Sequence, residues 1–386
     1  MLKLFKSSSL YGAFAKQLYD ADVGLSQLPF SAQRQYLLNQ SFCFGDSWKH
    51  YLEQTGDYQV SEHLSSVEPL QRRWASEQGI SVSDEGWQLE VLFAQLCKAK
   101  PDIWFSHALV PSSFRLKVRE RIPSIRLVIG YDGHWAHDPS IYQGCDLMLT
   151  CVQETAAFYR AKGFSSFYWP HGFDERILTR FSTQSRDVKC AFAGSVLLAG
   201  SMKHIQRLSF LAEISKSCEL FPAVYLSPST HVGFFRACCS NIKSGALREG
   251  LRLLRNYKPW HYMLSITKNP VYGLEMFKLL GSSKIALNLH GDVVTTAANK
   301  RLFEATGAGA CLVTDWHPNI SEFFEPDEEI VTYKSADECK QKILMLQKDE
   351  KRMQRIAAAG QKRCLRDHSA KSRLNLIDGL LKNWLT

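Results

Sequence analysis

From residue 100 onward, apolar runs of strand length alternate with stretches of helical periodicity. The first three predicted strands are Pro101–Ser106, Arg126–Tyr131 and Asp146–Thr150. A predicted helix ending at Arg121 separates the first two strands, and the helix Gln153–Lys162 stops before Gly163, a residue type that favours helix C-termini. Strands that alternate with helices in this way predict a parallel α/β sheet.

The alternation resumes after the polar stretch Phe181–Lys189 and predicts a second α/β domain. The predicted strands are Lys189–Ala193, Pro222–Pro228, Lys284–Leu289, Ala310–Val313 and Glu329–Tyr333. The predicted helices are a segment near Met202–Ser215, Tyr272–Leu280, Asp337–Leu346, Lys351–Gly360 and a last helix over Arg366–Leu385. We find no internal repeat and no low-complexity tract.

Residues 1–100 have a different pattern and are predicted to be mostly helical. Phe14–Tyr19 and Glu90–Leu96 place apolar residues at helical spacing. The D-x-D triplet Asp20-Ala21-Asp22 follows one of these stretches and leads into Pro29, with no predicted strand beside it. We therefore expect a capping or turn role for these acids and no metal-bound ligand.

The length and the net charge of the chain limit the number of domains and the kinds of binding partner. A chain of 386 residues is long enough for two domains. A net charge of +9 fits nucleic acid, an anionic membrane or a phosphorylated substrate, and it fits a mildly basic globular protein at least as well. No nucleic-acid motif is present, so we expect no nucleic-acid partner. The basic segment 236–255 is interpreted either as a solvated helix face or as a contact with an anionic acceptor or membrane surface.

The cysteines and the hydropathy of the chain indicate the cellular compartment in which the protein is expected. The 11 cysteines include no C-x-x-C, and several, such as Cys97, Cys190 and Cys311, stand in apolar surroundings. Reduced thiols explain this better than disulfides. No apolar run approaches the roughly 20 residues that span a bilayer, and no signal-peptide core is visible. We expect a cytoplasmic protein, with peripheral association at the inner face of the membrane as an open alternative.

The stretch Asn299–Asp315 (NKRLFEATGAGACLVTD) carries the most defined pattern. Arg301 and Glu304 are three residues apart and share a helix face, with Lys300 beside them. A surface ion pair is the ordinary explanation of this spacing. A ligand site is the alternative, because the helix leads into a buried strand and open α/β sheets bind ligands at the carboxyl ends of their strands.

Other candidates also follow predicted strands. Gly194-Ser195 forms a strand–glycine turn whose N–H groups would suit a phosphate, and Lys203 and Arg207 on the next helix would reach a diphosphate. His290-Gly291 follows another strand. Most such turns only reverse the chain, so the phosphate interpretation stands beside that simpler one.

The loop Asp132–Pro139 follows the strand Arg126–Tyr131. Asp132 and His134 therefore lie at the carboxyl end of a strand, where such sheets bind ligands. Two alternatives remain open: a zinc site shared by His134 and His137, whose spacing matches no metal motif, and a purely structural polar turn before Pro139.

The chain resembles the group-1 (GT-B) glycosyltransferases, most nearly their CgeB-like branch. The residues that carry the resemblance are Arg301-x-Phe303-Glu304-Ala305, Thr314-Asp315, Glu329-Ile330-Val331-x-Tyr333, Ile356-Ala357-x-x-Gly360, His368 and Arg373, with looser matches at Gln40–Leu52, Leu70–Ala75 and Tyr168–Asp174. The resemblance implies two Rossmann-like parallel α/β domains facing across a cleft, with a C-terminal helix that crosses back. It implies an acceptor-side domain over residues 1–175, a nucleotide-sugar domain over 176–365 and the terminal helix over 366–386.

The resemblance also implies roles for site residues. Glu304 corresponds to the carboxylate that accepts hydrogen bonds from a nucleotide ribose, and Lys300 and Arg301 would offset diphosphate charge, so that no metal and no cofactor is required. Retaining relatives carry a second glutamate eight positions earlier, where this chain has Thr296. We therefore hypothesise an inverting displacement. The resemblance implies that Asp132 or His134 would be the base that takes a proton from an acceptor hydroxyl.

The resemblance predicts a hexosyltransferase-type enzyme. Its partners would be a nucleotide-diphosphate sugar as donor and a polysaccharide, glycolipid or glycoprotein as acceptor. Two alternatives keep the fold: a non-catalytic coat or interaction protein, and a sugar-nucleotide-binding relative of the epimerases.

Overall fold

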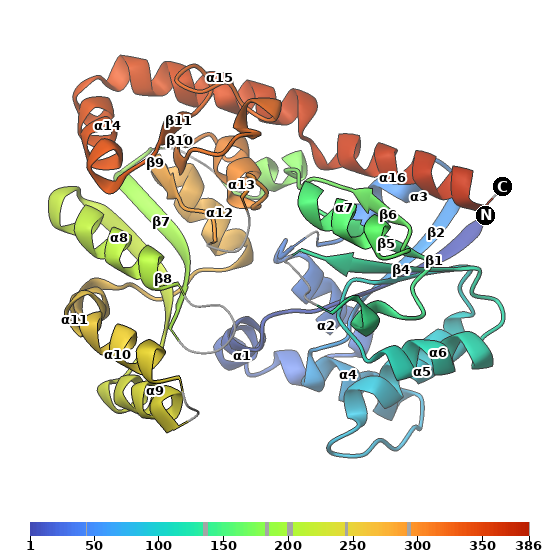
Figure 1. Ribbon diagram of the computed structural model, residues 1–386. Coiled ribbons are helices and arrows are strands. Elements are labelled where there is room, and N and C mark those ends of the chain that lie inside the picture. Colours follow the sequence, from blue (N-terminus) through green and yellow to red (C-terminus); the bar gives the residue numbers. More distant parts are fainter. Residues whose placement is uncertain are drawn as a thin grey trace. The chain divides into compact units, whose positions relative to one another are not determined.

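The computed structural model describes residues 1–43, 45–133, 138–181, 185–198, 204–243, 246–291 and 295–385 (Figure 1). The chain divides into two compact units. Unit 1 comprises Met1–Asp174 with Ala370–Thr386, and unit 2 comprises Glu175–Ser369.

Unit 1 is built on a parallel sheet that has six strands in the described residues, in the order β2-β1-β3-β4-β5-β6. The strands are β1 (Leu2–Ser8), β2 (Tyr58–Leu64), β3 (Ile103–Ser106), β4 (Leu127–Asp132), β5 (Leu147–Thr150) and β6 (Ser166–Tyr168). The α-helices are α1 (Gly12–Ala21), α2 (Phe30–Leu38), α3 (Ser47–Glu53), α4 (Glu68–Glu77), α5 (Trp87–Ala99), α6 (Ser112–Arg121), α7 (Gln153–Ala161) and α16 (Ala370–Leu385), with 3-10 turns η1 (Leu25–Gln27) and η2 (Pro139–Tyr142).

Helices cover both faces of this sheet because successive strand residues point to opposite sides. On β3, Phe105 packs in the cluster formed with α3 and α16, whereas Trp104 packs in the cluster formed with α5 and α6. The last helix, α16, contributes Leu374, Ile377 and Leu381 to the first cluster. A sheet buried on both faces explains why its central strands are continuous apolar runs.

The prediction that residues 1–100 are mostly helical is wrong at β1 and β2. Both strands carry polar residues at buried positions: Lys6 on β1, and Glu62 and His63 on β2, are all nearly inaccessible to solvent. Lys6 Nζ and Glu62 Oε2 form a buried ion pair at 2.6 Å. A buried strand is normally recognised in a sequence as a run of apolar residues. Charged residues interrupt that run in β1 and β2, so the sequence pattern does not indicate these strands.

Unit 2 is built on a parallel sheet with five strands in the part described, in the order β11-β10-β9-β7-β8. The strands are β7 (Val188–Leu197), β8 (Leu220–Ser227), β9 (Ser283–Asn288), β10 (Cys311–Asp315) and β11 (Val331–Tyr333). The α-helices are α8 (Ile205–Ser217), α9 (His231–Lys243), α10 (Leu247–Arg255), α11 (Tyr257–Ile266), α12 (Gly273–Ser282), α13 (Arg301–Gly307), α14 (Ala336–Lys348) and α15 (Glu350–Asp367), with 3-10 turns η3 (Glu175–Arg180) and η4 (Ile320–Glu322).

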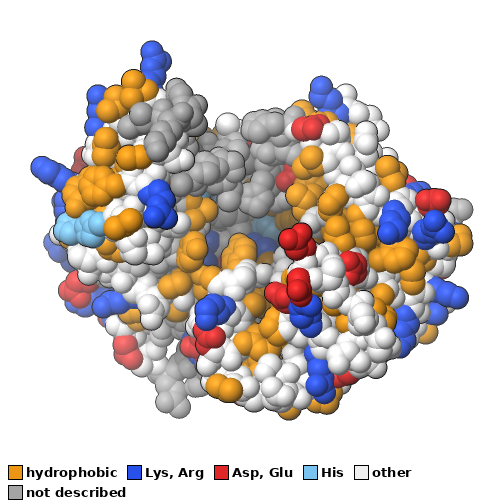
Figure 2. All heavy atoms as spheres, turned by 90° about the horizontal axis from the view of Figure 1, so that it is seen from below, with side chains coloured by type: hydrophobic (Ala, Val, Ile, Leu, Met, Phe, Trp, Pro, Cys, Tyr) orange, Lys and Arg blue, Asp and Glu red, His pale blue; other side chains and the backbone are white. Residues whose placement is uncertain are grey.

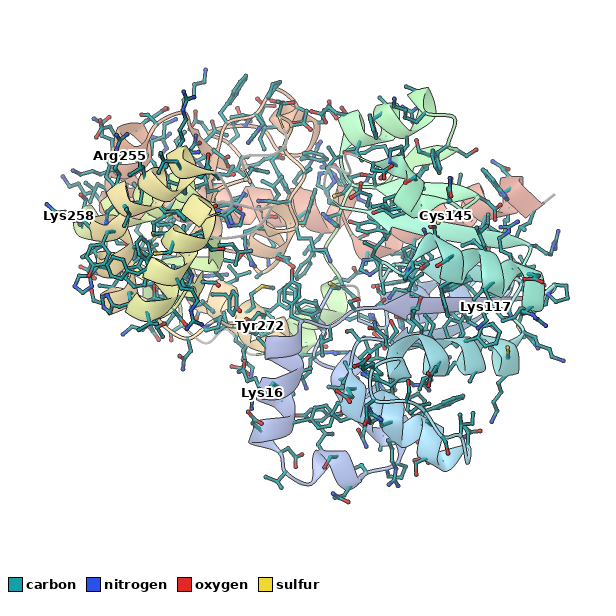
Figure 3. The ribbon with its side chains drawn as sticks, turned by 60° about the horizontal axis from the view of Figure 1, so that its bottom comes forward. Lys16, Lys117, Cys145, Arg255, Lys258 and Tyr272 are labelled. Atoms are coloured by element: carbon teal, nitrogen blue, oxygen red, sulfur yellow. The ribbon has the colours of Figure 1, made fainter. Side chains whose placement is uncertain are left out.

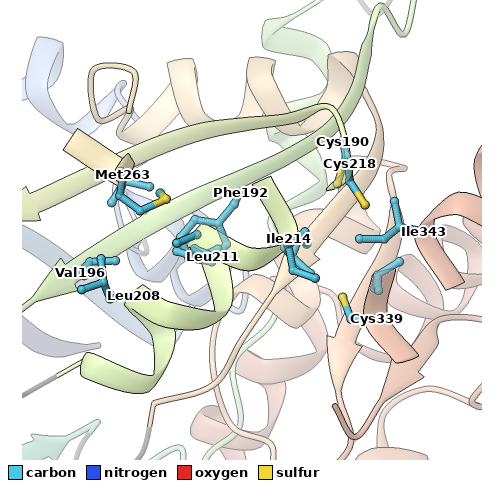
Figure 4. Close-up of a cluster of buried hydrophobic side chains, with 14 of the residues drawn as sticks. Cys190, Phe192, Val196, Leu208, Leu211, Ile214, Cys218, Met263, Cys339 and Ile343 are labelled. Atoms are coloured by element: carbon cyan, nitrogen blue, oxygen red, sulfur yellow. The ribbon is translucent and has the colours of Figure 1, made fainter. Parts of the chain in front are cut away.

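The core of unit 2 lies between the sheet and helices α8, α11 and α14. Figure 4 shows Leu208 and Leu211 of α8 against Phe192 and Val196 of β7. Met263 of α11 belongs to the same cluster. Alternate residues of β7 supply this cluster, as the two-residue period of a strand requires.

Two predicted boundaries after residue 175 are wrong. Gly194 and Ser195 do not form a turn but lie inside β7, where they pair with Val224 and Tyr225 of β8. The strand continues because β8 is long enough to pair as far as Leu197. The predicted last helix is also interrupted, since α15 ends at Asp367 and α16 begins at Ala370.

Three further features concern the cysteines, the D-x-D acids and the length of the helices. No disulfide joins any of the 11 cysteines. Asp22 accepts a hydrogen bond from Gly24 N at 3.0 Å and Asp20 pairs with Lys16, so the D-x-D acids have turn and surface roles. Among the described residues, no helix has both the length and the apolar character to cross a membrane.

Gly360 on α15 is expected to be intolerant of any side chain. A Cβ at this position would stand 2.2 Å from the backbone oxygen of Glu329. We expect Gly360→Ala to lower the free energy of unfolding by about 1–3 kcal/mol, because the backbone must shift to relieve the clash. Urea unfolding followed by circular dichroism measures the change.

Gly379→Ala on α16 is the matched control. A Cβ there meets no atom within 4 Å, and alanine favours the helix, so this variant is expected to gain up to about 1 kcal/mol. Equal effects of the two substitutions would contradict the close approach of α15 to Glu329.

Candidate functional site

A network of two histidines and one aspartate lies at the carboxyl end of the sheet of unit 2. Asp315 is the last residue of β10, and His290 follows the adjacent strand β9. His290 Nδ1 lies 2.7 Å from Asp315 Oδ1, and His317 Nε2 lies 3.0 Å from Asp315 Oδ2. The backbone N–H of His290 also donates to both carboxylate oxygens at 3.1 Å. One carboxylate therefore fixes the positions of both imidazoles.

The charges in this network follow from burial and hydrogen bonding. Burial disfavours an ionised Asp315, but the hydrogen bonds from His290 and His317 outweigh it and hold the pKa of the carboxyl below its usual range. Burial lowers the pKa of His290 despite the neighbouring carboxylate. A neutral His290 that donates Nδ1–H to Asp315 has its lone pair on Nε2. That atom is buried and has no hydrogen-bond partner among the described residues.

Amide and hydroxyl groups extend the network behind the histidines. Asn288 Nδ2 donates to Thr314 Oγ1 at 2.9 Å, and Asn299 Nδ2 donates to Asn288 Oδ1 at 2.9 Å. The Tyr333 hydroxyl donates to the backbone oxygen of Asn288 at 2.7 Å. These bonds join the ends of β9, β10 and β11 beside His290.

Arg301 and Glu304 form the ion pair that their spacing predicts. Arg301 Nη1 lies 2.9 Å from Glu304 Oε2, and both side chains are largely buried. Arg301 Nη2 donates to the backbone oxygen of Ala193 on β7 at 3.0 Å, which ties α13 to the sheet. The second oxygen of the Glu304 carboxylate has no partner in the part of the chain that the structure describes, and it is therefore able to accept a hydrogen bond.

The remaining donor-side candidates lie around the same strand ends. Arg207 on α8 donates to Ser195 O and to Leu289 O, each at 3.0 Å, and so links β7 to the residue before His290. Gly194 is the neighbour of Ser195 in β7, and Lys300 precedes α13 directly. The structure thus brings Gly194, Ser195, Arg207, His290, Lys300, Arg301 and Glu304 to one region of unit 2. Lys203 lies outside the described residues.

The predicted base in unit 1 is only partly described. Asp132, at the end of β4, is buried and accepts a hydrogen bond from the Tyr159 hydroxyl at 2.7 Å. Burial and this carboxylate raise the pKa of Tyr159, so the phenol remains a donor. His134 and His137 lie outside the described residues.

His290, Asp315 and His317 are also the described side chains that offer a metal-ligand set. Their ligand atoms lie within 4.8 Å of one another. These atoms are hydrogen-bonded to each other, and that arrangement satisfies Asp315 without a cation. A tetrahedral zinc site would use the same donor types, so metal dependence is a measurable alternative to the hydrogen-bonded network.

Sequence reasoning found His290 but missed its partners. Asp315 and Tyr333 appeared only as members of motifs that carry the family resemblance, and His317 and Asn288 were not singled out. The available signal was the series of polar residues that closes each apolar strand of a parallel sheet, because those strand ends meet at one edge.

His204 provides a test of acid sensitivity at this edge. Its buried Nδ1 accepts a hydrogen bond from Leu197 N at 3.3 Å, and burial together with Arg207 lowers its pKa to about 4. The unfolded chain binds a proton near pH 6.5 that the folded chain does not bind until about pH 4. We expect His204 to remove up to about 1.4 kcal/mol of stability per pH unit between pH 6.5 and about pH 4, and no more below that pH.

The measurement is the melting temperature as a function of pH for wild type and His204→Asn. Asparagine keeps an acceptor near the position of Nδ1 and does not titrate, so the loss between pH 6.5 and about 5 should become smaller. Identical pH profiles for the two proteins would contradict this assignment.

Comparison with known proteins places this geometry in context. Residues 245–378 match the family model described as Glycosyl transferase-like. No curated protein matches the chain significantly. A glycosyltransferase of Rickettsia africae ESF-5 matches with a TM-score of 0.55 at 9% identity, over 100% of this chain and 99% of that one.

Two further solved structures are similar over their full lengths. Anabaena Alr3699/HepE in complex with UDP and glucose has a TM-score of 0.55 at 10% identity, over 99% of this chain and 100% of that one. AviGT4, a glycosyltransferase involved in avilamycin A biosynthesis, has a TM-score of 0.53 at 13% identity, over 100% of this chain and 98% of that one. The predicted GT-B fold is confirmed, and so is the resemblance to the CgeB-like branch of the group-1 glycosyltransferases.

Proposed function

We propose that this glycosyltransferase-like protein of the GT-B fold transfers a hexose from a nucleotide-diphosphate sugar, and that unit 2 binds the donor. The carboxyl edge of a doubly wound parallel sheet is where such folds bind nucleotides. His290 and Asp315 follow or end adjacent strands at that edge of unit 2, and this position supports the proposal. The likeness to a structure named as a complex with UDP and glucose supports a uridine nucleotide as the first donor to test.

Glu304 is the observation that carries this proposal. Arg301 holds one carboxylate oxygen at 2.9 Å and leaves the other able to accept. Two vicinal ribose hydroxyls are donors that suit such a carboxylate. This largely buried carboxylate has one oxygen paired with Arg301 and another that is able to accept a hydrogen bond, which suits a bound ligand better than solvent.

The nearby cations suit a metal-independent departure of the nucleoside diphosphate. The anomeric C–O bond breaks in transfer, and negative charge develops on the leaving phosphate. Lys300 and Arg301 are placed beside Glu304, and we propose that they offset this charge. Full activity in a chelator is the expected result. Loss in EDTA with recovery on adding Zn²⁺ would instead favour a metal at His290, Asp315 and His317.

We propose an inverting displacement in which Asp132 or His134 acts as base. The acceptor hydroxyl oxygen bonds to the anomeric carbon, its proton passes to the base, and the donor diphosphate leaves. Thr296 stands where retaining relatives carry a glutamate, which favours inversion. If Asp132→Asn leaves transfer unchanged, Asp132 is not the base. The proposed acceptor is a polysaccharide, glycolipid or glycoprotein.

The experiment is release of nucleoside diphosphate from a panel of UDP-, GDP- and dTDP-sugars, with cell-envelope extract as acceptor source. One donor class should release diphosphate and label the extract, and Glu304→Gln should abolish both. Release of no diphosphate from any donor, together with no nucleotide binding, would favour the non-catalytic coat protein.

An epimerase relative is the second candidate. The fold is also similar to a structure named as a putative UDP-N-acetylglucosamine 2-epimerase of Listeria monocytogenes, with a TM-score of 0.51 at 10% identity. Conversion of a nucleotide sugar to its epimer without acceptor, detected by NMR of the sugar protons, would favour this candidate over transfer.

A further inference from the structure

Helix α10 exposes the apolar stripe that an amphipathic helix normally buries. Leu247, Leu251 and Leu254 follow one another at helical spacing and are 54%, 44% and 37% exposed. The face that packs inward is a different one, formed by Gly250 and Leu253. An exposed apolar stripe on a helix whose other face is already packed needs a further partner.

Arginines run beside this stripe along the same helix. Arg248, Arg252 and Arg255 repeat the spacing of the leucines one position later, so they form a parallel row about 100° around the helix axis. All three side chains are exposed and have no ion pair among the described residues. The helix therefore offers an apolar row and a cationic row to the same surroundings.

The neighbouring helices enlarge the surface. Helix α9, which packs against α10, exposes Val232 and Phe235 at 69% and 47%, with Arg236 beside them. Lys258, near the start of α11, is also exposed. Figure 3 shows Arg255 and Lys258 directed outward from these helices, and Figure 2 shows hydrophobic and basic side chains next to one another on the side where Figure 1 places α9–α11.

The segment is both basic and firmly anchored. His231–His261 holds six Lys or Arg and one Glu, which gives +5 of the net charge of +9 in this short part of the chain. Phe234, Leu253 and Trp260 anchor it in the core of unit 2. The exposed leucines therefore lie on helices whose other faces pack against the core of unit 2.

We propose that α9, α10 and the start of α11 form a binding surface for anionic membranes, here called the lipid face. Leucines and Phe235 would enter the headgroup boundary while the arginines contact lipid phosphates. The charge of this surface favours an anionic membrane over a second copy of the chain. Two copies would each bring the same charge of +5 and repel one another, whereas an anionic bilayer attracts the basic segment. The inference does not depend on the proposed catalytic activity.

The test is co-sedimentation of the full chain with vesicles of phosphatidylcholine alone or with 30% phosphatidylglycerol. We expect binding to the anionic vesicles only, weakened in 0.5 M NaCl because salt screens the arginines. The triple variant Arg248→Glu, Arg252→Glu, Arg255→Glu should weaken binding at least about tenfold. The pair Phe235→Ser, Leu251→Ser should weaken binding at unchanged charge.

A matched charge control lies on α15 of the same unit. Lys351, Arg355 and Lys362 are exposed and have no ion pair among the described residues, so their replacement by Glu changes the net charge equally. This control should bind anionic vesicles within about threefold of wild type, since only the more distant net charge has changed. Melting temperatures near that of wild type establish that each variant is folded.

The proposal is overturned if the chain does not bind anionic vesicles, or if it binds neutral vesicles equally well. It is also overturned if the α15 control loses as much binding as the α10 triple variant, or if Phe235→Ser, Leu251→Ser binds as wild type does. A dimer that Phe235→Ser, Leu251→Ser converts to a monomer would assign the surface to a second copy instead.

Discussion

Replacing Lys6 with methionine is expected to lower the free energy of unfolding by about 3–5 kcal/mol. Lys6 and Glu62 pair at 2.6 Å with 2% of each side chain exposed, and Glu62 also accepts the backbone N–H of Lys49. Burial already raises the pKa of Glu62 in spite of Lys6. Without the lysine, the carboxyl must stay buried without its counter-charge or take up a proton. Urea unfolding at pH 8 measures the loss.

Two further variants separate the lost ion pair from the lost side chain. The double variant Lys6→Met, Glu62→Leu removes both charges and is expected to recover most of the stability. Lys16 lies on α1 and is labelled in Figure 3. Lys16→Met breaks its exposed pair with Asp20 and should cost less than about 1 kcal/mol. Similar losses in Lys6→Met and Lys16→Met would contradict the account of β1 and β2.

Asp315→Asn is expected to reduce donor turnover by about 10²–10⁴-fold, if the proposed function is correct. The carboxylate accepts from both His290 and His317, whereas an amide accepts with one atom and donates with the other. One imidazole must then change its tautomer, and His290 Nε2 no longer keeps a fixed lone pair. Asp315 is a positioning residue, so kcat should fall more than the affinity for the nucleotide.

The control for this variant is Asp337→Asn in the first turn of α14, where the side chain is exposed. Its turnover should equal that of wild type. A folded Asp315→Asn variant whose turnover lies within about threefold of wild type would show that the network serves stability alone. A threefold change in rate corresponds to less than about 1 kcal/mol of activation free energy.

The fold was predictable where burial and apolarity coincide. The strands of unit 2 and the strands β3, β4 and β5 of unit 1 are short apolar runs between helices, and the structure contains them. The short strand β6 is only half-buried, and no apolar run marks it in the sequence. β1 and β2 were not predictable in this way, because Lys6 and Glu62 are buried as a pair. The sequence shows each charge alone, and only the paired register of the two strands explains their burial.

The site was predictable to the extent that its residues follow strands or share a helix face. Arg301 and Glu304 are three positions apart, and their pairing follows from helix geometry. The contacts of His290 with Asp315, and of Arg207 with Ser195 and Leu289, join residues far apart in the chain. Their positions depend on which strands are neighbours, and that order is fixed by tertiary packing.

The central claim is that unit 2 holds a nucleotide through Glu304, and a thermal-shift panel tests it most directly. UDP, GDP, dTDP, ADP and CMP would each be added to wild type, Glu304→Ala and the exposed control Glu328→Ala. One nucleotide at about 100 times its dissociation constant should raise the melting temperature of wild type and the control by about 5–10 °C, and that of Glu304→Ala far less. The account is contradicted if no nucleotide stabilises wild type, or if Glu304→Ala responds as wild type does.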